Sequence, residues 1–132
     1  MAIVGVAVGL AIPLAGTAHA TAARDGHCDD GEFCLYWDPV GADDGGSVSD
    51  FAVGDIPNLG PTQPTCYEFR GDGVGEGECV WRLADSAWNR TDRNVRVFTN
   101  VDYKNTSDLF LANRQRTNLN LAFRRNESID FL

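Results

Sequence analysis

The fold is decided by a strand–turn–strand stretch at Asn94–Phe110, which reads NVRVFTNVDYKNTSDLF. β-favouring residues stand on both sides of a polar turn that is rich in Asn and Asp. An earlier stretch has the same plan: Phe33–Asp38, then a turn rich in Gly and Asp, then Ser47–Phe51. Because internal repetition outranks other local signals, the sequence predicts two units of similar plan.

The ends of the two stretches also correspond. The closing phenylalanine is followed three residues later by Gly54 in the first copy and by Asn113 in the second. Gly and Asn both tolerate a positive φ, so we expect a turn at each position. Farther on, Asp85-Ser86 parallels Glu127-Ser128. We therefore place unit one at about residues 28–89 and unit two at about residues 93–132.

Short runs of β-favouring residues, separated by Gly, Pro, Asn and Asp, predict an all-β chain with no sustained helical period. Prolines between Gly54 and Thr65 predict a long loop in unit one. The clearest alternation, Asn118–Phe123, predicts a half-buried strand with Leu119, Leu121 and Phe123 on one face. The expected strands are Glu32–Trp37, Val48–Phe51, Cys66–Arg70, Cys79–Leu83, Val95–Thr99, Asp108–Leu111, Asn118–Phe123 and Ile129–Leu132.

The amino terminus has the features of a secretory leader. Residues 1–20 are apolar or small, apart from His19, and end in Ala18-His19-Ala20, a small-x-small cleavage pattern. The apolar run is too short and too interrupted for a membrane anchor. Cleavage would leave 112 of the 132 residues, which suits one compact domain at 21–132. We therefore expect a secreted protein with no membrane span.

Charge is unevenly distributed along this expected mature chain. Residues 21–80 contain 13 acidic side chains and two arginines, a net charge of −11, whereas residues 81–132 contain nine basic and six acidic side chains, a net charge of +3. The acidic total argues against nucleic acid as a partner, because phosphates require a basic face.

Four cysteines lie in this expected exported chain: Cys28, Cys34, Cys66 and Cys79. Oxidised pairs are typical of small exported domains. Three pairings are possible, and we favour the sequential one because each pair then brackets a turn-rich loop. A four-cysteine zinc site is the alternative, but no Cys-x-x-Cys spacing supports it.

With both units in view, the chain resembles the βγ-crystallin-like secreted bacterial proteins grouped with the streptomycete metalloproteinase inhibitors. The segments that carry the resemblance are Cys28–Tyr36, Gly45-Gly46-Ser47, Ser86–Asn89, Val95–Phe98 and Asn100–Tyr103. The resemblance implies two Greek-key units packed as a disulfide-stapled β-sandwich.

The resemblance also implies a function by binding. In the inhibitors, a disulfide-bounded loop opening with Thr-Cys is offered to a thermolysin-like protease, and Thr65-Cys66-Tyr67 looks like that loop. The bond Cys66–Tyr67 then becomes the candidate reactive site, with Tyr67 in the protease pocket that follows the scissile bond and Phe69 nearby. The alternative is that Tyr67 and Phe69 alternate along an ordinary strand, with one or both in the core.

A crystallin-type module that binds calcium or the cell envelope is the second functional hypothesis. Its candidate ligands are acids and a hydroxyl from two turns: Asp43, Asp44, Asp85 and Ser86. Gly46 and Arg82 stand where further oxygen ligands would be expected, so a solvated acidic turn is the competing interpretation of the first turn. The motifs typical of hydrolase, metalloprotease and nucleotide sites do not occur, and we expect a monomeric protein that is not an enzyme and needs no cofactor.

Overall fold

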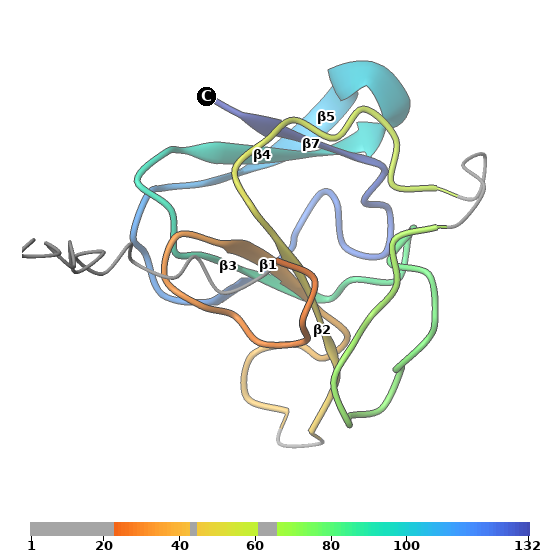
Figure 1. The fold of residues 1–132 in the computed structure, drawn as a ribbon. Helices are drawn as coiled ribbons and strands as arrows, with labels where there is room; N and C mark the ends of the chain where they lie inside the picture. The colour runs from red at the N-terminus through yellow and green to blue at the C-terminus, as the bar shows by residue number, and fades with distance from the viewer. Residues whose placement is uncertain (1–22, 43–44, 61–65) are drawn as a thin grey trace, which may run out of the picture.

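The computed structural model describes residues 23–42, 45–60 and 66–132 and is a β-sandwich of two antiparallel sheets (Figure 1). Within these residues there is no α-helix, and one short 3-10 turn, η1, lies at Val101–Tyr103. The predicted all-β fold is thus confirmed. The first sheet has the order β2-β1-β3-β6 and the second β5-β4-β7. Their strands are β1 Phe33–Tyr36, β2 Val48–Phe51, β3 Ser86–Asn89, β4 Val95–Asn100, β5 Lys104–Phe110, β6 Thr117–Asn118 and β7 Ser128–Phe131.

We call the chain up to Asn89, the end of β3, the first half and the chain from Arg93 onward the second half. Each half gives one extended segment to the sheet of the other half. Strand β6 comes from the second half but pairs with β3 of the first, where Thr117 lies opposite Ala87. Conversely, Ile56 from the first half pairs with Ile129 of β7, and the two residues exchange backbone N–H···O bonds of 2.9 Å. In Figure 1 the segment after β2 accordingly passes from the first sheet to the second. The two layers are joined by the backbone itself as well as by packing.

The repeated plan predicted from sequence has a structural counterpart. Phe51 lies opposite Phe33 in the β1–β2 pair, and Phe110 lies opposite Val95 in the β4–β5 pair. The turn residues that follow, Gly54 and Asn113, both have positive φ, at 157° and 52°.

The core lies between the two sheets. Alternation along β4 turns Val95 and Val97 inward, and both are fully buried. Phe33 of β1 meets Phe110 and Phe131 edge to face, with ring centroids 5.7 and 6.2 Å apart. Each such buried side chain contributes about 1.5–3 kcal/mol through removal of apolar surface from water. These contacts are what fix one sheet on the other.

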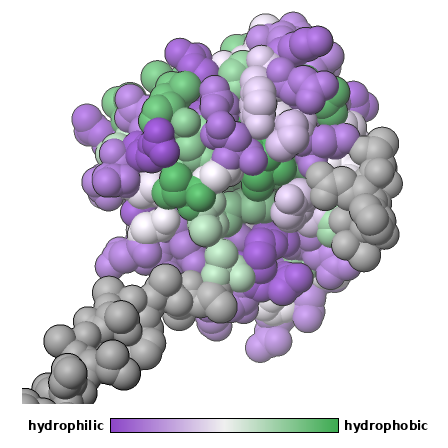
Figure 2. Space-filling view, turned by 45° about the horizontal axis from the view of Figure 1, so that its top comes forward, coloured by the Kyte–Doolittle hydropathy of each residue, from purple (hydrophilic) through white to green (hydrophobic). Residues whose placement is uncertain are grey.

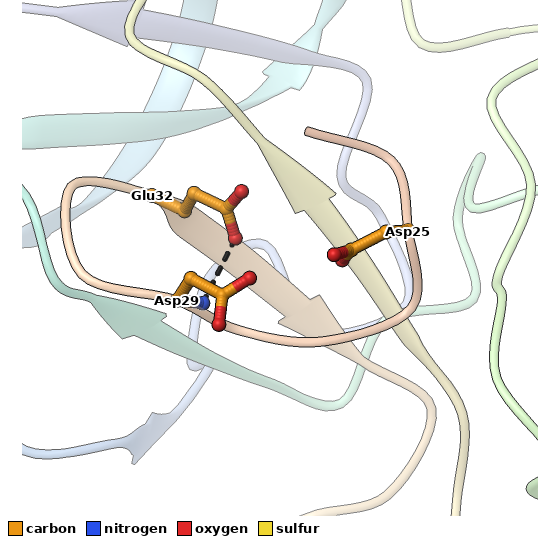
Figure 3. A group of neighbouring side chains, drawn as sticks. All are labelled: Asp25, Asp29 and Glu32. Atoms are coloured by element: carbon orange, nitrogen blue, oxygen red, sulfur yellow. Dashed lines mark hydrogen bonds between the residues drawn. The ribbon is translucent and has the colours of Figure 1, made fainter. Parts of the chain in front are cut away.

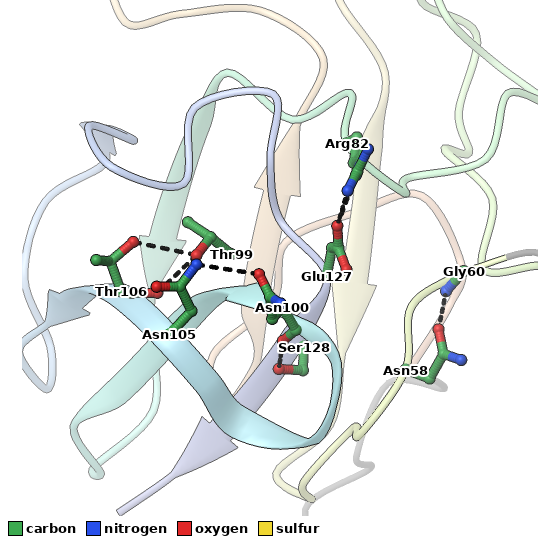
Figure 4. A network of polar contacts seen from close by, with 9 residues as sticks. All are labelled: Asn58, Gly60, Arg82, Thr99, Asn100, Asn105, Thr106, Glu127 and Ser128. Atoms are coloured by element: carbon green, nitrogen blue, oxygen red, sulfur yellow. Dashed lines mark hydrogen bonds and ion pairs between the residues drawn. The ribbon is translucent and has the colours of Figure 1, made fainter.

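Two ion pairs cross between the halves in a reciprocal arrangement. Arg82 of the first half pairs with Glu127 of the second, as Figure 4 shows, and Arg124 of the second half pairs with Asp85 of the first at 2.8 Å. Backbone hydrogen bonds connect the same two regions in both directions: Arg82 N donates to Asn126 O and Arg124 N donates to Ala84 O, each at 3.1 Å.

Asp85-Ser86 and Glu127-Ser128, the two acid–serine steps, each contain a buried serine whose hydroxyl donates a hydrogen bond to a residue at or just beyond the end of another strand. Ser86 Oγ donates to the carbonyl of Asp38 at 2.6 Å, and Ser128 Oγ donates to the carbonyl of Asn100 at 2.6 Å (Figure 4). Since both acids and both serines are buried, the two acid–serine steps have structural roles in the sandwich.

The prediction of a strand at Asn118–Phe123 was wrong beyond its first residue. The carboxylate of Asp108 accepts the backbone N–H groups of Asn120, Leu121 and Ala122 at 2.8–3.0 Å, which bends the chain into a turn. Leu119 is buried, but Leu121 and Phe123 are 49% and 42% exposed.

Two other predicted strands are reduced to isolated pairings. The β-pairing of Cys66–Arg70 with Cys79–Leu83 is one isolated bridge, between Glu68 and Cys79, beside the Cys66–Cys79 disulfide. The sequence analysis also missed β3, whose inward residues are small or polar. Strand β3 is central to its sheet because it pairs with both β1 and β6.

We predict that Arg124→Met lowers the free energy of unfolding by about 1–3 kcal/mol, because the Asp85 carboxylate, 4% exposed, would lose its charged partner. Denaturant unfolding followed by circular dichroism measures the change. Arg125→Met removes the exposed arginine next in sequence and is the matched control. Equal effects of the two substitutions would contradict a structural role for the crossed pair.

Candidate functional site

The candidate reactive segment begins a hairpin that a disulfide closes. Cys66 is bonded to Cys79, with Cα atoms 5.6 Å apart, and Cys28 is bonded to Cys34, with Cα atoms 5.9 Å apart. This is the sequential pairing favoured from the sequence, and with all four thiols oxidised, a four-cysteine zinc site is absent.

Backbone hydrogen bonds hold the segment extended on both of its edges. Val80 N donates to Tyr67 O at 2.7 Å, and Phe69 N donates to Glu78 O at 2.9 Å. On the opposite edge, Arg70 and Val48 exchange N–H···O bonds of 2.8 and 3.1 Å. The hairpin is therefore attached to the edge of the first sheet through β2.

Side chains alternate along this segment between the core and solvent. Phe69 is fully buried and meets Trp37 edge to face at 5.5 Å, whereas Glu68 is exposed. Tyr67 is half-buried and packs edge to face on Phe51 at 5.5 Å. The expectation that one or both aromatics serve the core thus holds for Phe69 in full and for Tyr67 in part.

The Arg24 side chain contacts both the backbone and an aromatic ring of the segment, a role that no sequence signal indicated. Its guanidinium donates to the carbonyl of Glu68 at 2.6 Å and lies 4.5 Å from the ring centroid of Phe51 and 5.4 Å from that of Tyr67. Burial and, secondarily, the charge of Arg70 lower the pKa of Arg24 from its usual value. Ser49 Oγ donates to the same Glu68 carbonyl at 3.0 Å.

The glycine-rich turn of the hairpin docks against the β1–β2 connection. Ser47 N donates to Val74 O at 2.9 Å, and Val74 N donates to Gly45 O at 3.2 Å. A Cβ atom on Gly75, whose φ is +88°, would lie 2.3 Å from the Trp37 ring. Glycine is therefore needed where the turn meets Trp37, and the turn is a fixed part of the structure.

We predict that Gly75→Ala destabilises the protein more than Gly77→Ala does. Both glycines have a similar positive φ, so both substitutions carry the same backbone strain, but a Cβ on Gly77 would meet open space. The extra overpacking at Gly75 costs about 1–3 kcal/mol. Denaturation midpoints of the two variants measure the difference, and equal midpoints would show that Trp37 does not fix the turn.

The calcium ligands expected from sequence are divided between described and undescribed parts of the chain. Asp43 and Asp44 lie outside the described residues. The Asp85 carboxylate accepts two hydrogen bonds from Arg124, at 2.8 and 3.2 Å. The Ser86 hydroxyl donates to Asp38 O and accepts from Arg116 Nε at 2.8 Å. Asp85 and Ser86 are therefore already engaged by protein partners.

The surface hollow beside β5 has no carboxylate, histidine or thiol among the described residues that line it, so it offers no acid–base partner for the Thr117 hydroxyl. It has a volume of about 620 Å³, and its lining, taken from the described residues, includes Leu109, Leu111, Asn113 and Arg114 but no carboxylate, histidine or thiol. Figure 2 shows that one face of the molecule is largely hydrophilic, with hydrophobic side chains gathered near its centre. The hollow is thus a surface feature with no catalytic constellation.

The described part of the chain contains no helix that is long and apolar enough to cross a membrane.

Comparison with known proteins identifies one family: the model of peptidase inhibitor family I36 matches residues 21–110. No curated protein and no solved structure matches the chain.

Proposed function

Because the chain belongs to peptidase inhibitor family I36, we propose that it inhibits a thermolysin-like metalloprotease by offering the Cys66–Tyr67 peptide bond to the protease active site. The family match makes the protein peptidase-inhibitor-like, with a protease as its partner. The class of protease, the reactive bond and the residues beside it are the proposal.

The observation that carries the proposal is that both sides of the Cys66–Tyr67 bond are held in place. The disulfide to Cys79 holds the residue before the bond, and the hydrogen bond from Val80 N holds the carbonyl of Tyr67. One residue farther on, Arg24 and Ser49 both hold the carbonyl of Glu68. A segment ordered before binding loses little conformational entropy when it enters a protease cleft, which increases affinity.

The same attachments explain how a cleavable bond can belong to an inhibitor. Hydrolysis would add one water across the bond, leaving a carboxylate on Cys66 and an amino group on Tyr67. The disulfide would keep the first new end attached, and the contacts of Tyr67, Glu68 and Phe69 would keep the second in place. Because the new ends stay close together, resynthesis of the bond competes with release.

Tyr67 is the residue that enters the protease pocket after the scissile bond in this proposal. Its ring would first leave Phe51 and Arg24. An edge-to-face aromatic contact contributes about 0.5–1.5 kcal/mol and a cation–π contact about 0.5–1 kcal/mol. That cost is small beside the roughly 12 kcal/mol of a nanomolar complex. Phe69 remains in the core and anchors the segment.

The location proposed for this activity is outside the cell. Two disulfides among the described residues fit an oxidising compartment. The leader-like residues 1–20 support export, and we propose that the mature protein acts as a monomer that binds one protease molecule.

We predict that the oxidised mature protein inhibits thermolysin stoichiometrically and that Tyr67→Ala weakens inhibition by about 30-fold or more, as loss of a central interface residue does. Trp81→Ala is the matched control, because Trp81 is another half-buried aromatic packed against the core but lies outside the proposed contact. Titration of residual protease activity gives the inhibition constants, and thermal melts verify that both variants are folded.

Two results would contradict the proposal. Equal inhibition constants for Tyr67→Ala and the parent protein would place the contact elsewhere on the surface. No inhibition at micromolar concentrations of folded protein would exclude this class of protease and leave a binding module of the crystallin type.

A further inference from the structure

Three carboxyl groups converge at the start of the described chain, in a region that the proposed inhibitory contact does not use. Asp25, Asp29 and Glu32 precede β1, and one carboxylate oxygen from each lies within 4.8 Å of the other two. Figure 3 shows the three side chains turned toward a common space between the loop and the first strand.

Glu32 distinguishes this group from an ordinary solvated acidic turn. Its side chain is 4% exposed, and its Oε2 accepts a hydrogen bond from Asp29 N at 2.9 Å. Within the described residues, Glu32 Oε1 and Asp29 Oδ2 are buried and have no hydrogen-bond partner. Buried carboxylate oxygens without a partner are costly and uncommon in native proteins, so each calls for a ligand.

Two arginines that adjoin or contact the loop carrying the cluster, Arg24 and Arg90, are engaged with other groups. Arg24 contacts Ser49, the Glu68 carbonyl and the Asp50 carbonyl. Arg90 forms an ion pair with Asp30 and donates to the Cys28 carbonyl. Among the ion pairs of the described residues, none includes Asp25, Asp29 or Glu32. Within residues 23–42, 45–60 and 66–132, the negative charge of the cluster therefore has no counter-ion in an ion pair.

The backbone around the cluster is fixed in position. The Asp50 carboxylate accepts the N–H groups of Asp25 and Gly26 at 3.0 and 2.9 Å. The Cys28–Cys34 disulfide ties the loop to β1, and Gly31 N donates to Arg90 O at 3.0 Å. The three carboxylates thus have a preformed arrangement.

We propose that Asp25, Asp29 and Glu32 bind a calcium ion. Calcium takes oxygen ligands at about 2.3–2.6 Å in flexible geometry, so oxygens up to 4.8 Å apart can share one ion, with waters completing its shell. Zinc is disfavoured because it prefers sulfur and nitrogen ligands, and Cys28 and Cys34 are oxidised. Magnesium requires a tighter octahedron and gives up its waters reluctantly.

The proposed site shares no residue with the calcium set expected from the sequence, Asp43, Asp44, Asp85 and Ser86. It joins Asp25, near the start of the described chain, to Glu32, the residue directly before β1, so calcium would stabilise the fold whether or not the protein inhibits a protease. Asp25 is also the neighbour in sequence of Arg24, whose guanidinium donates to the carbonyl of Glu68, so the proposed calcium site lies one residue from a support of the candidate reactive segment.

The test is a titration of the chelator-treated, oxidised mature protein with calcium chloride, followed by calorimetry and by thermal melts. We expect one calcium per chain and a melting temperature that rises by about 5 °C or more at saturation. Glu32→Gln should abolish this rise while raising the melting temperature in chelator, because it removes a buried, unpaired charge. Asp72→Asn, which removes an exposed acid outside the cluster, should behave as the parent does.

Asp25→Asn is a second variant at an exposed position, and it should weaken calcium binding without affecting the fold. The proposal is overturned if the calcium-dependent rise persists in both Glu32→Gln and Asp25→Asn. It is also overturned if the parent protein shows no binding at about 10 mM calcium, a concentration above the range of extracellular calcium modules. A rise lost only in Asp43→Asn/Asp44→Asn would overturn it in favour of the other set.

Discussion

The exchange of one extended segment between the two halves of the chain is the constraint on which the structure depends. Ile56 forms an isolated bridge to β7 in the sheet of the second half, and β6 is the edge strand that the second half adds to the first sheet, so each sheet is paired with a segment from the other half. The crossed ion pairs, Arg82 with Glu127 and Arg124 with Asp85, lie where the halves meet. Burial of both carboxylates means that correct pairing of the halves is needed to satisfy them.

The hairpin between Cys66 and Cys79 belongs to the first half, and the proposed function depends on it. After giving Ile56 to the second sheet, the chain returns to the edge of the first sheet, where it forms the disulfide-closed hairpin between Cys66 and Cys79. Core packing holds Phe69, while Cys66 and Tyr67 are only half-buried. The proposed inhibitory bond therefore lies at the border between a rigid core and solvent, where a substrate-like segment can be both accessible and ordered.

Sequence patterns identified the features that depend on local chemistry. A run of β-favouring residues predicted β4, and the Gly54 and Asn113 turns and the disulfide pairing followed from residue type and spacing. Tertiary contacts decided the features that the sequence analysis missed. Asp108 bends the chain after Asn118 by capturing three N–H groups, and β3 consists largely of small and polar residues whose place comes from its neighbours. The carboxylates of Asp25, Asp29 and Glu32 converge with the help of the Asp50 contacts and the first disulfide, which residue spacing alone does not reveal.

The most direct test of the inhibitory account is to identify the bond that the protease cuts in the complex. The inhibitor is incubated with thermolysin, quenched in acid and analysed by intact mass and amino-terminal sequencing without reduction. We expect a mixture of the intact chain and a form one water heavier, with a single new amino terminus at Tyr67, while inhibition is maintained. Sustained inhibition with cleavage at another bond, or with no cleaved form at any time, would contradict the assignment of Cys66–Tyr67 as the reactive bond.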